Sequence, residues 1–209
     1  MSKIITRVYP DYAAADLAIK DLKKAGLSDS DISILASNAE GWHRAKGGDV
    51  DPRHDKDRDG RDDRAEGAAT GGAIGAVAGG AAGAAVGLGL IAIPGVGPLV
   101  AFGWLATLAA GAIAAGAAGG IIGALVESGV SKENAEIYAE ALRRGGAIVT
   151  AKVPDDEEGK YLVLMDNSAL DPANLEASWR RAGWEGYDAS APHFTSEQAR
   201  LERESYRRS

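Results

Sequence analysis

Three short stretches of the chain predict β-strands, the first because its residues alternate and are rich in β-forming types. These are Ile4–Tyr9, Asp31–Ala36 and Ala147–Val153. Between the first two strands the apolar residues take up helical spacing. Asp11 can cap the start of that helix, and Gly26 can end it. The first 36 residues therefore predict a β-α-β unit.

The third strand begins a second unit that resembles the first. Ile5-Thr6 and Tyr9-Pro10-Asp11 recur 144 positions later as Val149-Thr150 and Val153-Pro154-Asp155. A helix is predicted over 155–166 and a short final strand near 169–175. Because order, spacing and the Pro-Asp pair agree, we interpret the two units as a duplication. Together they predict an α+β fold, a ferredoxin-like split βαβ sandwich.

A long insertion separates the two units. A polar linker is followed by 60 residues, 67–126, that contain no Asp, Glu, Lys, Arg or His. A helix over 132–144, capped by Ser131, then leads into the second unit. The predicted divisions are 1–36 for the first half-unit, 37–65 for the linker, 66–128 for the insertion, 129–178 for the second half, and 179–209 for a charged tail containing tryptophan.

The charge-free stretch predicts a helical hairpin. Ile93-Pro94-Gly95-Val96-Gly97-Pro98 favours a turn near its middle, because two prolines and two glycines interrupt regular structure. The turn separates segments 67–93 and 99–127. Each segment would be about 40 Å long as a helix, enough to cross a hydrocarbon core of about 30 Å with tilt.

Small residues recur every four positions in both segments, which is typical of a glycine zipper. Glycine in a helix interior costs about 1 kcal/mol relative to alanine, so this pattern predicts compensating close contact between helices. The residues predicted to make these contacts are Gly67, Gly71, Gly75, Gly79, Gly83, Gly87, Gly103, Gly111, Gly119 and Gly123. A spacing of four also makes the small-residue stripe wind around the helix. One partner helix cannot cover the stripe, so self-association is expected.

Two environments could hide this hairpin, and the sequence leaves both open. A lipid bilayer is favoured by the length of the charge-free run, which would place the protein in a bacterial inner membrane with a cytoplasmic domain. The alternative is a cytoplasmic homo-oligomer whose hairpins bury one another. The N-terminal residues are too polar for a signal peptide, and the mixed charges at 64–66 and 127–132 do not fix an orientation.

The linker also contains a candidate calcium loop. Residues 55–66 fit the twelve-residue pattern D-x-D-x-D-G-x5-E, in which Gly60 permits the sharp turn. The expected ligands are Asp55, Asp57, Asp59, the carbonyl of Arg61, Asp63 and Glu66. Against this, no entering helix precedes the loop, and four basic residues dilute its charge. A solvated linker is the equal alternative. If the loop binds Ca²⁺, the one cofactor considered, the chain would instead be a calcium-binding regulatory or sensor module.

Composition excludes several function classes. The chain has 209 residues, a net charge of −7 and no cysteine. The acidic balance argues against nucleic acid as a partner, because binding phosphates needs a basic face. Without cysteine there are no disulfides, thiolate metal sites or cysteine nucleophiles. No nucleophile motif, phosphate loop or small-molecule substrate site is recognisable, so the sequence predicts a protein that is not an enzyme.

Several structural motifs resemble a known family. They are Gly26-Leu27-Ser28 with Asp31-Ile32-Ser33-Ile34, the Ile93–Pro98 turn, the Leu142-Arg143-Arg144-Gly145-Gly146 run, and the closing Gly183-Trp184-x-Gly186-Tyr187-Asp188. Across most of its length the chain is similar to bacterial general stress proteins of the 17M type, the heat-induced stress proteins. The resemblance implies stress-linked expression, and it carries over no catalytic residue.

Overall fold

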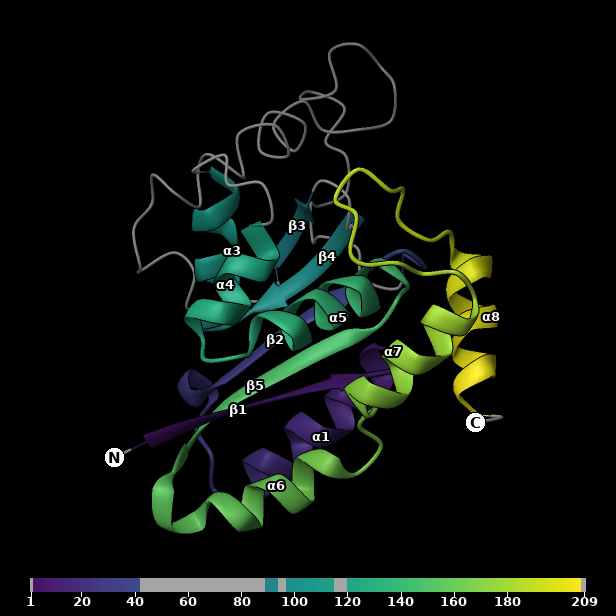
Figure 1. Ribbon diagram of the computed structural model, residues 1–209. Helices are drawn as coiled ribbons and strands as arrows, with labels where there is room; N and C mark the ends of the chain where they lie inside the picture. The colour runs from purple at the N-terminus through teal and green to yellow at the C-terminus, as the bar shows by residue number, and fades with distance from the viewer. Residues whose placement is uncertain (1, 42–88, 94–96, 115–119, 208–209) are drawn as a thin grey trace, which may run out of the picture.

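The protein is built on an antiparallel five-stranded sheet covered by helices on both faces (Figure 1). The computed structural model describes residues 2–41, 89–93, 97–114 and 120–207. The strands are β1 (Ser2–Tyr9), β2 (Ile32–Ser37), β3 (Gly89–Ile93), β4 (Gly97–Phe102) and β5 (Ala147–Pro154), in the order β1-β5-β2-β4-β3. The α-helices are α1 (Tyr12–Lys24), α3 (Trp104–Ala114), α4 (Gly120–Glu127), α5 (Lys132–Arg143), α6 (Glu158–Asp166), α7 (Pro172–Arg181) and α8 (Ser196–Tyr206). The predicted α+β class is confirmed.

The first β-α-β unit forms as the sequence predicts. The Asp11 side chain accepts a hydrogen bond from the amide of Ala14 and so caps α1, while Gly26 follows the helix with a φ of +104°. β1 and β2 are not neighbours, because β5 lies between them and runs antiparallel to both. Residues from two distant parts of the sequence therefore make the centre of the sheet.

The second unit forms only in part. Its strand β5 and its helix α6 are confirmed, and a short 3-10 turn over Asp155–Glu157 precedes α6. The predicted strand at 169–175 is wrong. Only Leu170 pairs with β1, through a bridge to Val8, and the chain then enters α7. The Asp171 side chain accepts from the amides of Ala173 and Asn174, and Pro172 suits the first helical turn, so a helix starts where the strand was expected.

The predicted helical hairpin is wrong around its turn. The chain does reverse between Ile93 and Gly97, but the flanking segments 89–93 and 97–102 are strands that pair with each other. β4 also pairs with β2, so the hairpin extends the sheet. Helices occupy 104–114 and 120–127, in the predicted second segment. Residues 67–88, which make up most of the predicted first segment, lie outside the described part of the chain.

The second half of the charge-free stretch supplies part of the hydrophobic core. Leu99, Val100, Leu105, Ile121 and Leu125 are all buried. Most of these side chains pack with α5, with Trp179 of α7 and with Val8 on one face of the sheet. α1 and α6 cover the opposite face. Within the described ranges, the structure contains no helix with the length and apolar character needed to cross a bilayer.

The buried side chain of Tyr9 should make the protein less stable in alkaline solution. Its ring is fully buried, its hydroxyl donates to the carbonyl of Met165 at 2.6 Å, and burial raises its pKa. Above pH 10 the unfolded state loses this proton while the folded state keeps it, so the free energy of unfolding should fall as pH rises. Tyr9→Phe should reduce that slope by about 1 kcal/mol per pH unit in urea titrations between pH 10 and 11. Below pH 9 the two proteins should show parallel profiles, and equal slopes above pH 10 would contradict the prediction.

Candidate functional site

The most deeply buried carboxylate in the described part of the chain belongs to Glu140 on α5. Its side chain is 1% exposed. Oε2 accepts from Arg143 Nε at 2.8 Å, and Oε1 accepts from Arg143 Nη2 and, at 2.5 Å, from Arg144 Nε. The helix brings the three together, because positions three and four apart lie on one side of a helix. One carboxylate thus binds two guanidinium groups at the C-terminal end of α5.

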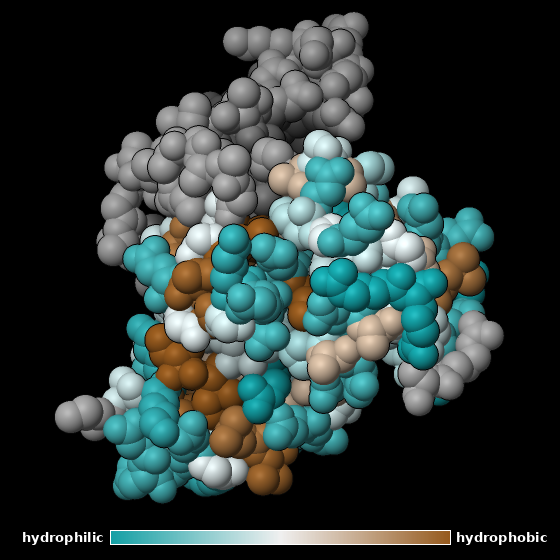
Figure 2. Space-filling view, in the orientation of Figure 1, coloured by the Kyte–Doolittle hydropathy of each residue, from teal (hydrophilic) through white to brown (hydrophobic). Residues whose placement is uncertain are grey.

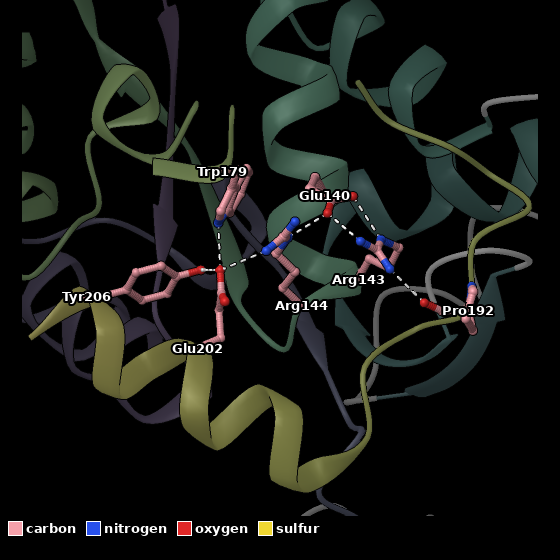
Figure 3. Close-up of polar contacts among 7 residues, drawn as sticks. All are labelled: Glu140, Arg143, Arg144, Trp179, Pro192, Glu202 and Tyr206. Atoms are coloured by element: carbon pink, nitrogen blue, oxygen red, sulfur yellow. Dashed lines mark hydrogen bonds and ion pairs between the residues drawn. The ribbon is translucent and has the colours of Figure 1, made fainter. Parts of the chain in front are cut away.

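A second carboxylate, Glu202 of α8, extends this cluster (Figure 3). Its Oε1 accepts from Arg144 Nη1 at 3.1 Å, from Trp179 Nε1 at 2.6 Å and from the Tyr206 hydroxyl at 3.1 Å. Burial, and then the Glu202 charge, raise the pKa of Tyr206. The hydrogen bond to Glu140 raises the pKa of Arg143. We name Glu140, Arg143, Arg144 and Glu202 the buried charge cluster; its two positive and two negative groups balance.

The buried charge cluster fixes the C-terminal arm of the chain, residues 182–206, to α5. Arg143 Nη1 donates to the carbonyl of Pro192 at 2.7 Å, and the amide of Phe194 donates to the Arg143 carbonyl at 3.0 Å. Both guanidinium groups lie over the Phe194 ring, and Arg144 also lies over Trp179 at 4.6 Å. Buried cation–π contacts of this kind add to the ion pairs. The arm is therefore held by charge, ring stacking and backbone hydrogen bonds together.

Two glycines let the arm and the sheet approach the end of α5. Gly145 has a φ of +103°, and a Cβ there would lie 2.5 Å from Cβ of Ala199 on α8. A Cβ on Gly146 would lie 2.9 Å from the carbonyl oxygens of Tyr9 and Ala141. Their amides donate to Leu142 and Ala141, which completes the helix end. Only glycine fits both positions without movement of neighbouring backbone or α8.

A cavity of about 220 Å³ lies beside α8, between the start of α1 and the end of β2. Alanines and the Tyr12 ring form much of its lining. Arg203 of α8 stands at its edge, paired with Glu40 and 3.6 Å from Asp11. Because this guanidinium is neutralised by two carboxylates, the cavity presents no unpaired charge from Arg203 to a ligand.

A larger cleft of about 500 Å³ lies at the outer edge of β1. Arg7, Tyr138, Asp166 and Leu170 contribute to its lining. Arg7 Nε donates to Asp166 at 2.5 Å, and Tyr138 lies with its hydroxyl 3.5 Å from the Thr6 carbonyl. Burial raises the pKa of Tyr138. The cleft is thus polar at its walls and borders exposed strand backbone.

The structure describes few of the residues that the sequence singled out. The candidate calcium ligands Asp55, Asp57, Asp59, Arg61, Asp63 and Glu66 lie outside the described ranges, as do Gly67, Gly71, Gly75, Gly79, Gly83, Gly87 and Gly119. Within those ranges no group of three or more metal-ligating side chains comes together. Calcium binding therefore stays a prediction.

The zipper glycines inside the described ranges do not share one role. Gly103 lies between β4 and α3, not within a helix, and packs against the backbone of Ile32 and Ser33 of β2. Gly123 is on α4, where an added Cβ would meet nothing within 4 Å. Gly111 lies within α3. Helix-to-helix packing is therefore wrong for Gly103, and the described structure supplies no close partner at Gly123.

Sequence reasoning missed the buried charge cluster. The predicted helix over 132–144 ends with Arg143 and Arg144, and basic residues at that end favour the helix dipole without any further partner. The signal for more was present, since Glu140-x-x-Arg143-Arg144 places an acid three and four positions before two bases. The partners from the tail, Trp179 and Glu202, carry no such spacing signal. Comparisons with protein-family models, with curated protein sequences and with solved structures give no match to this chain.

Proposed function

We propose that this chain is a non-enzymatic, self-associating stress-type protein. An α+β domain carries the charge-free segment 67–88, and contacts made by that segment drive assembly. The stress role is what the resemblance described above implies. The observation that carries the proposal is the fate of the other charge-free residues: Leu99, Leu105, Ile121 and Leu125 are buried inside the domain.

Both halves of the charge-free stretch, 67–126, need to shield their apolar surface from water. Residues 67–88 contain no formal charge and only four aliphatic residues larger than alanine, Ile74, Val77, Val86 and Leu88. Such a sequence has no charged side chains for water to solvate. It also has few large apolar side chains with which to build a hydrophobic core. Its glycines permit close helix packing, for which a second copy is the simplest partner.

The non-enzymatic part of the proposal is supported by how the buried polar groups are used. The carboxylates of Glu140 and Glu202 accept hydrogen bonds from side chains of the same chain, namely Arg143, Arg144, Trp179 and Tyr206. A general acid or base must reach a substrate proton at hydrogen-bond distance. Carboxylates enclosed by guanidinium groups of the same chain are better suited to holding α8 in place.

We also infer that the domain is a ferredoxin-like sandwich with an added hairpin. β1 and β2 flank β5, and Leu170 pairs with the outer edge of β1. This is the arrangement of a split βαβ fold whose last strand is reduced to one bridge. The hairpin of β3 and β4 then extends the other edge of the sheet.

Gly75→Leu should disrupt assembly. Sedimentation of the full chain in detergent-free buffer should show a large species for the unmodified protein and smaller species for the variant, because a bulky side chain separates the helices. Ala73→Leu is the matched control, since position 73 lies on the opposite side of a helix from position 75 and should leave assembly intact.

Two results would change the proposal. A monodisperse monomer for the unmodified protein would contradict self-association. Retention of the chain in membranes after a carbonate wash would show that the segment 67–88 is held in a bilayer and not by other copies of the chain. The same fractions, sized before and after washing, decide between these outcomes.

A further inference from the structure

The outer edge of β1 is open for most of its length in the described structure. On one side β1 pairs with β5 along all eight residues. On the other side the described residues supply one backbone contact, from the amide of Leu170 to the carbonyl of Val8 at 2.8 Å. The chain then turns into α7, so Ser2–Arg7 has no neighbouring strand among the described ranges. An exposed strand edge of this kind is a template for pairing.

The Leu170 contact shows which residues face outward. Since the Val8 carbonyl points away from β5, alternation along a strand turns the backbone groups of Ser2, Ile4 and Thr6 outward as well. The Thr6 carbonyl already accepts from Arg7 Nη1 at 3.0 Å. Ser2 and Ile4 make no hydrogen bond on this side with the described residues. The Ile4 side chain is 42% exposed.

The surface around this edge of β1 is partly hydrophobic, which favours contact with another strand over contact with water. Figure 2 shows hydrophobic surface that runs from the first part of β1 toward α6. Ile4 on β1, Val126 on α4 and Val163 on α6 are among the exposed large hydrophobic residues. The polar cleft of about 500 Å³ borders the edge at Arg7 and Leu170.

We propose that β1 of a second copy pairs antiparallel with this edge, about a two-fold axis at Ile4. Ile4 then lies opposite Ile4 of the partner subunit, and Ser2 opposite Thr6 of the partner subunit. The two five-stranded sheets join into one sheet of ten strands. This contact is separate from residues 67–88, on which the proposed function depends.

Charge and space select this register from its neighbours. A two-fold at Lys3 would place Lys3 opposite the partner's Lys3, and a two-fold at Ile5 would place Lys3 opposite the partner's Arg7. Like charges directly opposite each other destabilise strand pairs. A two-fold at Ile5 would also bring the partner's Ser2 to Val8, where Leu170 already lies. The Ile4 register avoids both conflicts.

Lys3 does not oppose this pairing, whereas Arg7 must share or release the Thr6 carbonyl so that the partner's Ser2 amide can bind it. Lys3 and Arg7 have side chains on the α6 side, where Lys3 pairs with Glu158 and Arg7 with Asp166, each at 2.5 Å. Both cations are therefore neutralised within their own chain. Two isoleucines meet on the other side of the sheet at the centre of the contact.

A single cysteine tests the register, because the chain contains none of its own. Opposed residues in a hydrogen-bonded antiparallel pair have Cα atoms about 5.5 Å apart, which suits a disulfide. Ile4→Cys with an added oxidant should therefore give a covalent dimer on a non-reducing gel. Ser2→Cys is the matched control, because in this register the two copies of Ser2 are offset by four residues. Equal cross-linking of both variants would overturn the proposal.

Opposite charges introduced at Ile4 test the register independently and need no cross-linking reaction. Ile4→Lys and Ile4→Glu should each raise the dimer dissociation constant at least about tenfold in sedimentation equilibrium. An equimolar mixture should restore dimers, since Lys then faces Glu. Circular dichroism checks that each variant is folded, and Ile4→Thr should still dimerise. Failure of the mixture to recover dimers would overturn the Ile4 register.

The two proposals about assembly fail separately. If Gly75→Leu leaves assembly intact while Ile4→Lys dissociates the dimer, the β1 contact stands and the role proposed for 67–88 falls. If Ile4→Lys leaves the dimer intact while Gly75→Leu removes assembly, the reverse holds. An unmodified chain that sediments as a monomer would overturn both.

Discussion

Glu140→Ala is expected to lower the free energy of unfolding by about 3–5 kcal/mol, as removal of one partner of a buried ion pair does. The variant leaves Arg143 and Arg144 facing each other without their shared carboxylate. Their side chains are only 10% and 12% exposed, so water cannot fully replace Glu140. Urea denaturation at pH 7 measures the loss. Glu140→Gln should cost less, because the amide oxygen can still accept one of the bonds.

The control for Glu140 is a similar pair on the surface. Glu176 and Arg180 of α7 form an i,i+4 ion pair whose side chains are 38% and 55% exposed. Glu176→Ala should change stability by only about 0.5 kcal/mol or less. Equal effects at the two positions would show that the buried charge cluster does not hold the arm. Protease cleavage of the arm, followed by mass spectrometry, should become faster in Glu140→Ala alone.

Gly103→Ala should destabilise the domain by about 3 kcal/mol, from backbone strain together with overlap in a packed region. Gly103 has a φ of +85° at the junction of β4 and α3. A Cβ there would lie 2.5 Å from the carbonyl oxygen of Ile32 and 2.9 Å from Cα of Ser33. Ser33 also holds this junction, since its hydroxyl donates to the Phe102 carbonyl and accepts from the Leu105 amide. Displacement of β2 would therefore loosen the start of α3.

Gly129→Ala separates strain from overlap. Gly129 has a similar φ of +97°, but an added Cβ there would meet nothing within 4 Å. It should cost only about 1 kcal/mol, the conformational part of the penalty. Thermal unfolding of both variants gives the comparison. A loss at Gly103 no larger than the loss at Gly129 would contradict the packing argument.

The parts of the fold that follow local rules were predictable. The caps of α1 and α5 and the strands β1, β2 and β5 each leave a signal in neighbouring residues. The strand β3 and the start of β4 leave no such local signal. Short apolar runs have no polar positions to show their period, so helix and strand are indistinguishable there. Pairing of β4 with β2, a contact between distant residues, decides the outcome.

The buried charge cluster was predictable only within α5. Glu140, Arg143 and Arg144 are close in sequence, so helical spacing predicts that they meet. Glu202 and Trp179 come from two other helices, and their positions depend on how the tail folds back. The strand wrongly predicted at 169–175 has a local cause instead, because Asp171-Pro172 starts a helix at once and leaves room for a single paired residue, Leu170.

The place of β5 in the sheet has a consequence for synthesis. β5 lies between β1 and β2, yet more than a hundred residues separate it from them along the chain. A ribosome must therefore make residues through 154 before the first two strands gain their shared neighbour. Until then β1 and the edge of β2 that faces β5 carry unpaired backbone, and α1 lacks part of the apolar surface that it packs against. We expect the nascent chain to need chaperone protection, and refolding to be slow, because strand pairing across such separations has a large loop-closure cost.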